Sequence, residues 1–146
     1  MGEAGTWGTS PRVSIEREVS TRGHDGFVVG CRSLLRGERV DGALLLALAG
    51  PAAQPFLADP DRPDAYWLRV WGARGLLWEW DEAAEAEIAA ALSDESWRVR
   101  EMALKVAARH RIGDVLDGVV ACRADSVARV RAAADRAAQI IVGSSA

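Results

Sequence analysis

The chain has 146 residues, of which 49% are hydrophobic and 27% charged, with a formal net charge of −3. This length suits a single domain with a hydrophobic core, and the composition is that of a soluble globular protein. The longest apolar run, residues 42–50, is far too short to span a bilayer, so we expect no membrane partner.

The residue types favour helices over strands. Ala, Leu, Arg and Glu dominate, and runs of β-branched residues are short. One Lys against seventeen Arg is typical of a GC-rich bacterial coding sequence. The N-terminus lacks a basic region followed by an apolar one, so no secretory signal is predicted and we expect a cytoplasmic protein. Cys31 and Cys122 are far apart and predict buried thiols, not a metal site.

Residues 1–25 are rich in Gly, Ser, Thr and charge without a sustained period, and predict a flexible tail. A single all-α domain is expected over residues 26–142, and a frayed C-terminus over 143–146. Turn and capping residues divide the domain into helices. The predicted helices span residues 27–35, 40–49, 52–58, 65–80, 82–92, 94–110, 115–123 and 127–142.

A repeat of 31 residues organises the C-terminal two thirds of the chain. It aligns Trp67-Leu68-Arg69 with Arg98-Val99-Arg100 and with Arg129-Val130-Arg131. Small residues recur just after these triplets, at Gly72, Ala103 and Ala134, where they would let neighbouring helices approach closely. Helix pairs repeated at about this length are the signature of an α-solenoid.

The repeated residues Asp94, Val99, Arg100 and Ala103, with Asp125, Val130, Arg131 and Ala134 one unit later, resemble the HEAT repeat. The resemblance implies a short right-handed α-solenoid of about three HEAT-like hairpins over residues 61–142, with residues 27–58 as an N-terminal helical cap. In that family an Asp–Arg ladder joins adjacent repeats, and the second helices line the concave face. It also implies a structural role for Arg69, Arg100 and Arg131. Most members are scaffolds or adaptors, and a minority bind DNA or are enzymes.

A second row of side chains lies beside the core face of the repeated helices. Successive residues of a helix are about 100° apart, which places four residues of each unit on this flank. In the middle unit they are Arg98, Met102, Lys105 and Arg109. They are Arg129, Ala133, Arg136 and Ile140 one unit later, and Trp67, Trp71, Arg74 and Trp78 one unit earlier. Two interpretations remain open. The flank is either a solvated charged surface with tryptophans packed between units, or a groove that holds an extended or helical segment. The predicted partner-binding residues are Trp67, Trp71, Arg74, Arg98, Met102, Lys105, Arg109, Arg129 and Arg136.

The charge distribution bears on the partner. Residues 98–146 carry nine basic and five acidic residues, whereas residues 1–97 carry nine basic and sixteen acidic. This polarity favours an acidic protein or peptide docking on the C-terminal units over nucleic acid, whose phosphates the acidic half would repel. The alternative is a DNA-binding protein or a HEAT-like DNA glycosylase that uses the same face, since Trp78-Glu79-Trp80-Asp81 superficially resembles such a cleft. A homodimer through the tryptophan patch is a third possibility.

The sequence predicts no catalytic, cofactor or metal site. His24 falls in the predicted tail, and His110 ends a helix, where its interaction with the helix dipole is sufficient explanation. Asp81 is expected to cap a helix. We therefore expect a non-enzymatic scaffold or adaptor that binds a protein or peptide segment on its concave face.

Overall fold

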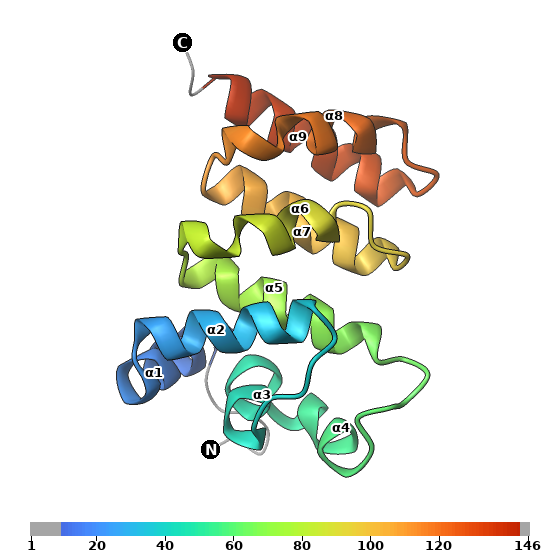
Figure 1. Cartoon of the computed structure of the whole chain (residues 1–146). Coiled ribbons are helices and arrows are strands. Elements are labelled where there is room, and N and C mark those ends of the chain that lie inside the picture. The colour runs from blue at the N-terminus through green and yellow to red at the C-terminus, as the bar shows by residue number, and fades with distance from the viewer. Residues whose placement is uncertain (1–9, 144–146) are drawn as a thin grey trace. The chain divides into compact units, whose positions relative to one another are not determined.

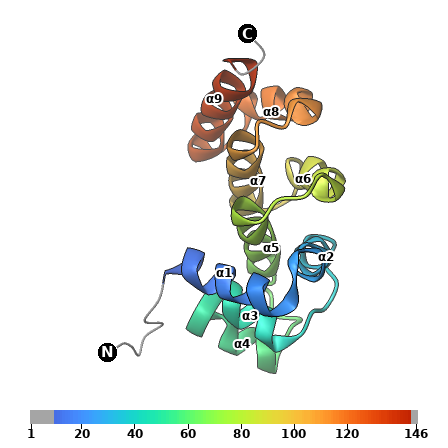
Figure 2. The ribbon, with the colours of Figure 1, turned by 90° about the vertical axis from the view of Figure 1, so that its left-hand side faces the viewer.

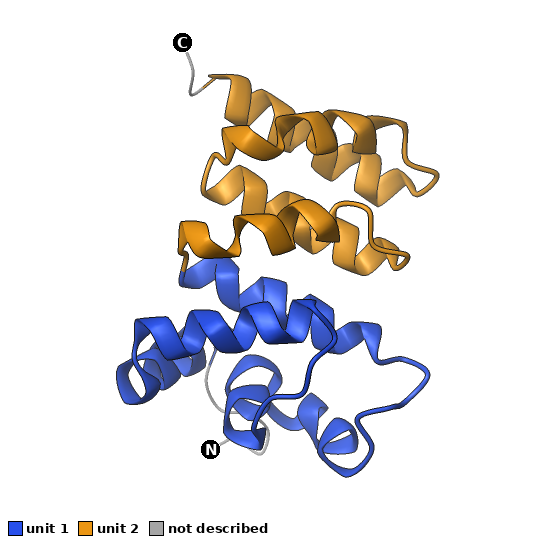
Figure 3. Ribbon diagram, viewed as in Figure 1, with its two compact units in different colours: residues 1–79 blue, residues 80–146 orange. Residues whose placement is uncertain are grey.

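The computed structural model describes residues 10–143, and every regular element in that range is helical. The chain divides into two compact units, residues 1–79 and residues 80–146 (Figure 3). Unit 1 contains α1 (Pro11–Arg22), α2 (His24–Leu35), α3 (Gly42–Ala49), η2 (Gly50–Ala53), α4 (Gln54–Ala58) and α5 (Tyr66–Trp78) (Figure 1). Unit 2 contains η3 (Glu82–Ala84), α6 (Glu85–Ala91), α7 (Trp97–Arg109), η4 (Gly113–Val115), α8 (Leu116–Ala121), η5 (Cys122–Ala124) and α9 (Ala128–Gly143).

The first helix corrects the prediction of a flexible tail through residue 25. Ser10 caps α1 by accepting a hydrogen bond from the Val13 N–H at 3.2 Å, and Pro11 suits the first helical position. Only Ile15 of this helix is fully buried, so α1 has no apolar stripe that the sequence could reveal. A hydrogen bond from Ser14 Oγ to the Ala47 carbonyl at 2.8 Å helps to hold it against α3. Residues 1–9 and 144–146, which include the rest of the predicted tail and most of the predicted frayed end, lie outside the described range.

The crossing of α2 and α5 forms the centre of unit 1. Two glycines of α5 allow it, as the recurrence of small residues predicts. A Cβ atom on Gly72 would lie 2.8 Å from the Cys31 carbonyl oxygen and 2.9 Å from Leu34 Cβ, and one on Gly75 would overlap Cys31 Sγ. The helix backbones are therefore in contact, and burial raises the pKa of the Cys31 thiol well above its usual range.

Unit 2 consists of two helical hairpins. α6 packs on α7, α8 packs on α9, and α7 packs along α9, so that α7 and α9 form one layer and α6 and α8 the other (Figure 2). The core face predicted for the repeat is buried, as shown by Val99, Ala103 and Val106 of α7 and by their counterparts Val130, Ala134 and Ala137 of α9. Each hairpin turns into its second helix in the same way. The Asp94 carboxylate accepts from the Ser96 N–H at 2.8 Å, and the Asp125 carboxylate accepts from the Val127 N–H at 2.9 Å.

The helices of residues 10–143 are short relative to a bilayer. None combines the length and the apolar character that crossing a membrane would need.

Candidate functional site

An arginine and an aspartate join the two hairpins of unit 2. Arg100 donates from Nε and Nη2 to the two carboxylate oxygens of Asp125, at 2.8 and 3.1 Å, and from Nη1 to the Asp94 carbonyl at 2.8 Å. Both side chains are mostly buried, with 15% of Arg100 and 10% of Asp125 exposed. The guanidinium holds the pKa of the Asp125 carboxyl below its usual value. A mostly buried Arg–Asp bond thus joins the two hairpins, and it gives Arg100 a structural role.

Arg131 lies one unit later and is more exposed. Its Nη1 donates to the Asp125 carbonyl at 2.8 Å, which repeats the contact between Arg100 and the Asp94 carbonyl. These arginines therefore close the turns that precede α7 and α9.

The flank beside this seam carries the predicted basic row of unit 2. Lys105 and Arg109 of α7 and Arg129 and Arg136 of α9 are exposed, while Arg98 and Met102 are half-buried. α7 and α9 are neighbours, so the structure brings these six predicted residues to one pair of adjacent helices.

Trp97 and Glu101 belong to the same surface, and the sequence prediction missed both. The guanidinium carbons of Arg98 and Arg129 lie 4.4 and 5.2 Å from the centroid of the Trp97 ring, close enough for cation–π attraction. Arg129 also donates from Nε and Nη2 to the Glu101 carboxylate, at 3.0 and 3.2 Å. The signal was available, because Trp97 and Glu101 are four residues apart on one helix and Trp97 directly precedes Arg98.

Lys105 and Arg136 differ from the other cations of this surface. Both are exposed, and neither has a hydrogen bond or an ion pair with another residue of the described range. By contrast, Arg129 is paired with Glu101. Lys105 and Arg136 therefore retain their full capacity to bind an acidic group from outside the chain.

The two layers of unit 2 carry opposite charge. α7 has four basic residues against Glu101, and α9 has three against Asp135. The segments 82–91 and 113–121, which contain α6 and α8, hold three and two carboxylates respectively and no basic residue. The side chains of Glu85 and Asp114 are hydrogen-bonded to each other, which raises the pKa of Glu85. One layer is thus basic and the other acidic.

In unit 1 the corresponding flank of α5 is covered, which corrects part of the predicted binding set. Trp71 is only 4% exposed and meets Phe56 of α4 edge to face, with ring centroids 5.1 Å apart. Arg74 is half-buried, its Nη1 donates to the Leu48 carbonyl of α3 at 3.0 Å, and burial lowers its pKa. Trp67 is half-buried beside Trp71. α3 and α4 occupy this flank, so Trp71 and Arg74 belong to the core of unit 1 and not to a binding surface.

The residues at the end of α5 and after it have structural partners. In unit 1, Trp78 packs under the guanidinium of Arg12, 5.3 Å from the ring centroid. Glu79 lies 2.5 Å from Nδ1 of His24, which belongs to α2 and not to a tail.

The residues at the start of unit 2 also serve the fold. The Asp81 carboxylate accepts from the Ala83 N–H at 2.8 Å, as its predicted capping role requires. Trp80 stacks on the ring of His110, which is the C-cap residue of α7, with centroids 4.9 Å apart. Each residue of the stretch 78–81, which superficially resembles a glycosylase cleft, therefore has a structural partner within its own unit.

Comparisons of the chain with protein-family models, with curated proteins and with solved structures find no match.

Proposed function

We propose that the chain is a short HEAT-like α-solenoid and that the basic flank of α7 and α9 binds an acidic segment of a protein partner. This flank, called the α7–α9 surface below, consists of Trp97, Arg98, Glu101, Met102, Lys105, Arg109, Arg129 and Arg136. The sequence repeat supports the solenoid, since it runs from residue 67 to residue 137, and so does the contact of the two hairpins of unit 2 through α7 and α9. The observation that carries the binding proposal is the pair of exposed cations, Lys105 and Arg136, which lack partners within the described range.

The α7–α9 surface offers apolar contact as well as charge. Trp97 and Met102 are half-buried, so each presents part of an apolar side chain beside the cations. Each exposed ion pair contributes only about 0.2–1 kcal/mol, so charge alone would give weak binding. Aromatic and arginine anchors supply most of the affinity in protein interfaces, while complementary charge raises the association rate. The partner best suited to this surface is an acidic segment with one or two large apolar residues.

The acidic layer of unit 2 argues against nucleic acid. A DNA duplex is long relative to α7 and α9 and presents phosphates on every side. The carboxylates of the α6–α8 layer and Glu101 on the basic surface would oppose many of them. A compact acidic peptide avoids this repulsion, because it meets only the α7–α9 surface.

Fluorescence anisotropy with three labelled probes tests the proposal. The probes are a peptide that alternates Glu with Leu and Trp, its Lys-for-Glu counterpart, and a DNA duplex. We expect the acidic peptide to bind, to weaken as salt is raised, and to lose about tenfold or more in affinity with Lys105→Glu plus Arg136→Glu. A matched control, Arg12→Glu plus Arg17→Glu, makes the same change in net charge on exposed residues of α1 and should leave most of the binding intact.

Two results would contradict the proposal. Equal losses in the test and control variants would mean that net charge, and not this surface, governs binding. Tighter, salt-dependent binding of the duplex would favour the nucleic-acid reading instead. Circular dichroism of each variant verifies that the helices remain folded.

A further inference from the structure

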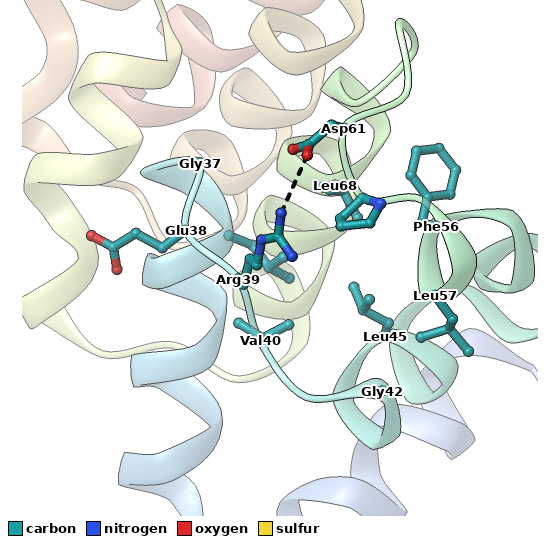
Figure 4. A pocket seen from close by; sticks show the side chains of 12 residues that line it. Gly37, Glu38, Arg39, Val40, Gly42, Leu45, Phe56, Leu57, Asp61 and Leu68 are labelled. Atoms are coloured by element: carbon teal, nitrogen blue, oxygen red, sulfur yellow. Dashed lines mark hydrogen bonds and ion pairs between the residues drawn. The ribbon is translucent and has the colours of Figure 1, made fainter.

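Unit 1 contains an open pocket of about 260 Å³, far along the chain from the α7–α9 surface. It lies between the end of α2, the loop 37–42, α4 and the turn before α5 (Figure 4). Its apolar lining includes Leu34, Val40, Leu45, Phe56, Leu57 and Leu68. A neighbouring hollow of about 320 Å³ shares part of this wall, so the pocket extends toward Arg62 and Ala65.

The local packing explains why the space stays open. Phe56 is directed toward Trp71 and is 5% exposed, which leaves the next residue, Leu57, 39% exposed at the edge of the pocket. A Cβ atom on Gly42 would lie 3.2 Å from Leu57 Cδ2, so the glycine leaves room for this leucine. Gly37, with a φ of +78°, reverses the chain after α2 and starts the loop that forms one wall.

Arg39 lies at the opening of the pocket. Its guanidinium projects from the loop toward Asp61, and Nη2 donates to Asp61 Oδ2 at 3.2 Å (Figure 4). Both side chains are highly exposed, at 73% and 81%, and an ion pair so exposed contributes little to stability. Within the described range this is the sole hydrogen bond of the guanidinium, so Nε and Nη1 remain available.

Two other ion pairs lie near the pocket, and both are less exposed than the pair of Arg39 with Asp61. Glu38 accepts two hydrogen bonds from Arg36, at 3.1 and 3.2 Å, and its side chain is directed away from the opening (Figure 4). Arg62 pairs with Asp64 at 3.0 Å. Arg39 is therefore the cation best placed to accept a new anionic partner.

We propose that this pocket binds a small apolar carboxylate, with the apolar body on the leucines and Phe56 and the carboxylate on Arg39 in place of Asp61. A guanidinium binds a carboxylate best through two parallel hydrogen bonds, whereas Asp61 accepts only one. An apolar cavity of roughly 150 Å³ is sufficient for benzene, so this larger pocket accommodates an aromatic ring with a short chain.

Three probes with the same apolar body and different charge test this inference. They are 3-phenylpropionate, 3-phenylpropanol and 3-phenylpropylamine, each titrated at millimolar concentration into the 15N-labelled chain. The propionate should shift the amide resonances of residues 37–42, 57 and 61. We expect it to bind about tenfold more tightly than the alcohol, since a charge-assisted hydrogen bond is lost, and the amine should bind least.

Variants separate the two parts of the pocket. Arg39→Gln should reduce the propionate affinity about tenfold and leave that of the alcohol unchanged. Asp61→Asn, which removes the internal competitor, should raise the propionate affinity. Arg36→Gln is the control, because Arg36 binds Glu38 outside the opening, and it should change neither.

Any of three results overturns the inference. They are equal affinities for the three probes, resonance shifts confined to α7 and α9, and no shift at a probe concentration of about 10 millimolar. A specific ligand of this size should have a dissociation constant no weaker than about 10 millimolar, so it would produce shifts at that concentration. None of them contradicts the acidic-segment proposal, whose probes and variants concern unit 2.

Discussion

Replacing Arg100 with Met tests the seam between the two hairpins of unit 2. The change removes two charge-assisted hydrogen bonds to Asp125 and one to the Asp94 carbonyl, while it keeps most of the apolar stem. An exposed pair is worth about 0–1 kcal/mol, and breaking a fully buried pair costs about 3–5 kcal/mol. Arg100 is 15% and Asp125 10% exposed, and Asp125 would still accept the hydrogen bond from the Val127 N–H. We therefore expect the free energy of unfolding to fall by about 2–4 kcal/mol.

Urea unfolding followed by far-UV circular dichroism measures this loss. Arg123→Met is the matched control, because Arg123 pairs with Asp135 at a similar distance, 2.9 Å, with both side chains more than half exposed. The control should cost less than about 1 kcal/mol. A double-mutant cycle of Arg100→Met with Asp125→Asn should show a coupling of about 1–3 kcal/mol. A coupling below about 0.5 kcal/mol would refute the view that this bond stabilises the seam.

The same pair has a defined dependence on pH. Arg100 lowers the folded-state pKa of Asp125, so its stabilisation is complete above the ordinary carboxyl pKa and is lost as pH falls through the lowered value. The difference in stability between the natural chain and Arg100→Met should therefore shrink below about pH 4. A difference that stays constant down to the acid transition would mean that packing, and not charge, produces it.

Three further changes test other parts of the fold by the same unfolding assay. Gly72→Ala should lower the free energy of unfolding by about 1–2 kcal/mol, because the cost of overpacking against the backbone of α2 exceeds the gain in helix propensity. The control, Gly113→Ala, has nothing within 4 Å of its added Cβ and should be neutral or stabilising. Equal effects of the two changes would contradict the close approach of α2 and α5. The folded state raises the pKa of Glu85 beside Asp114, so the natural chain should gain stability as the pH falls and Glu85 takes up a proton. Glu85→Gln should therefore be more stable than the natural chain at pH 7 and should lack this gain. An unchanged pH profile would exclude the pairing of Glu85 with Asp114. Ile15→Ala should cost about 2–5 kcal/mol if α1 is an integral part of unit 1, and almost nothing if it is not.

The sequence predicted most helices because the signals that define them are local. Asp94 and Asp125 each precede a helix and bind the N–H two residues later, so the turns can be read from a few adjacent residues. The spacing of Val99, Ala103 and Val106 on one face likewise depends on the helix alone, and all three are buried. The Asp–Arg bond of the seam was an expectation from the resemblance to the HEAT repeat, and the spacing of residues alone does not predict it.

The covered flank of α5 depends on contacts between segments that are distant in sequence. Trp71 meets Phe56, and Arg74 meets the Leu48 carbonyl, but no spacing within α5 identifies these partners. One sequence signal was present. Where α7 and α9 have Met102 and Ala133, α5 has Trp71, and this larger apolar side chain indicates that another element covers the flank.

α1 was missed for a related reason. It has one buried apolar residue, Ile15, and is otherwise held by polar contacts such as the ion pair of Arg22 with Asp41 at 2.7 Å. Hydrophobic periodicity cannot detect a helix that buries so little apolar surface. Ser10-Pro11, a capping residue followed by a favourable first position, was the local signal for its start.

The opposite charge of the two layers gives unit 2 an electric dipole moment directed across the hairpins. An approaching acidic segment would exert a torque on this dipole and turn the α7–α9 layer toward itself before any side chains touch. At physiological ionic strength the Debye length is about 8 Å, so this alignment acts only over the last nanometre of the approach. Raising the salt concentration should therefore slow association of the segment more than it speeds its dissociation. This difference separates the effect of the dipole on the encounter from the contribution of charge to the stability of the final complex.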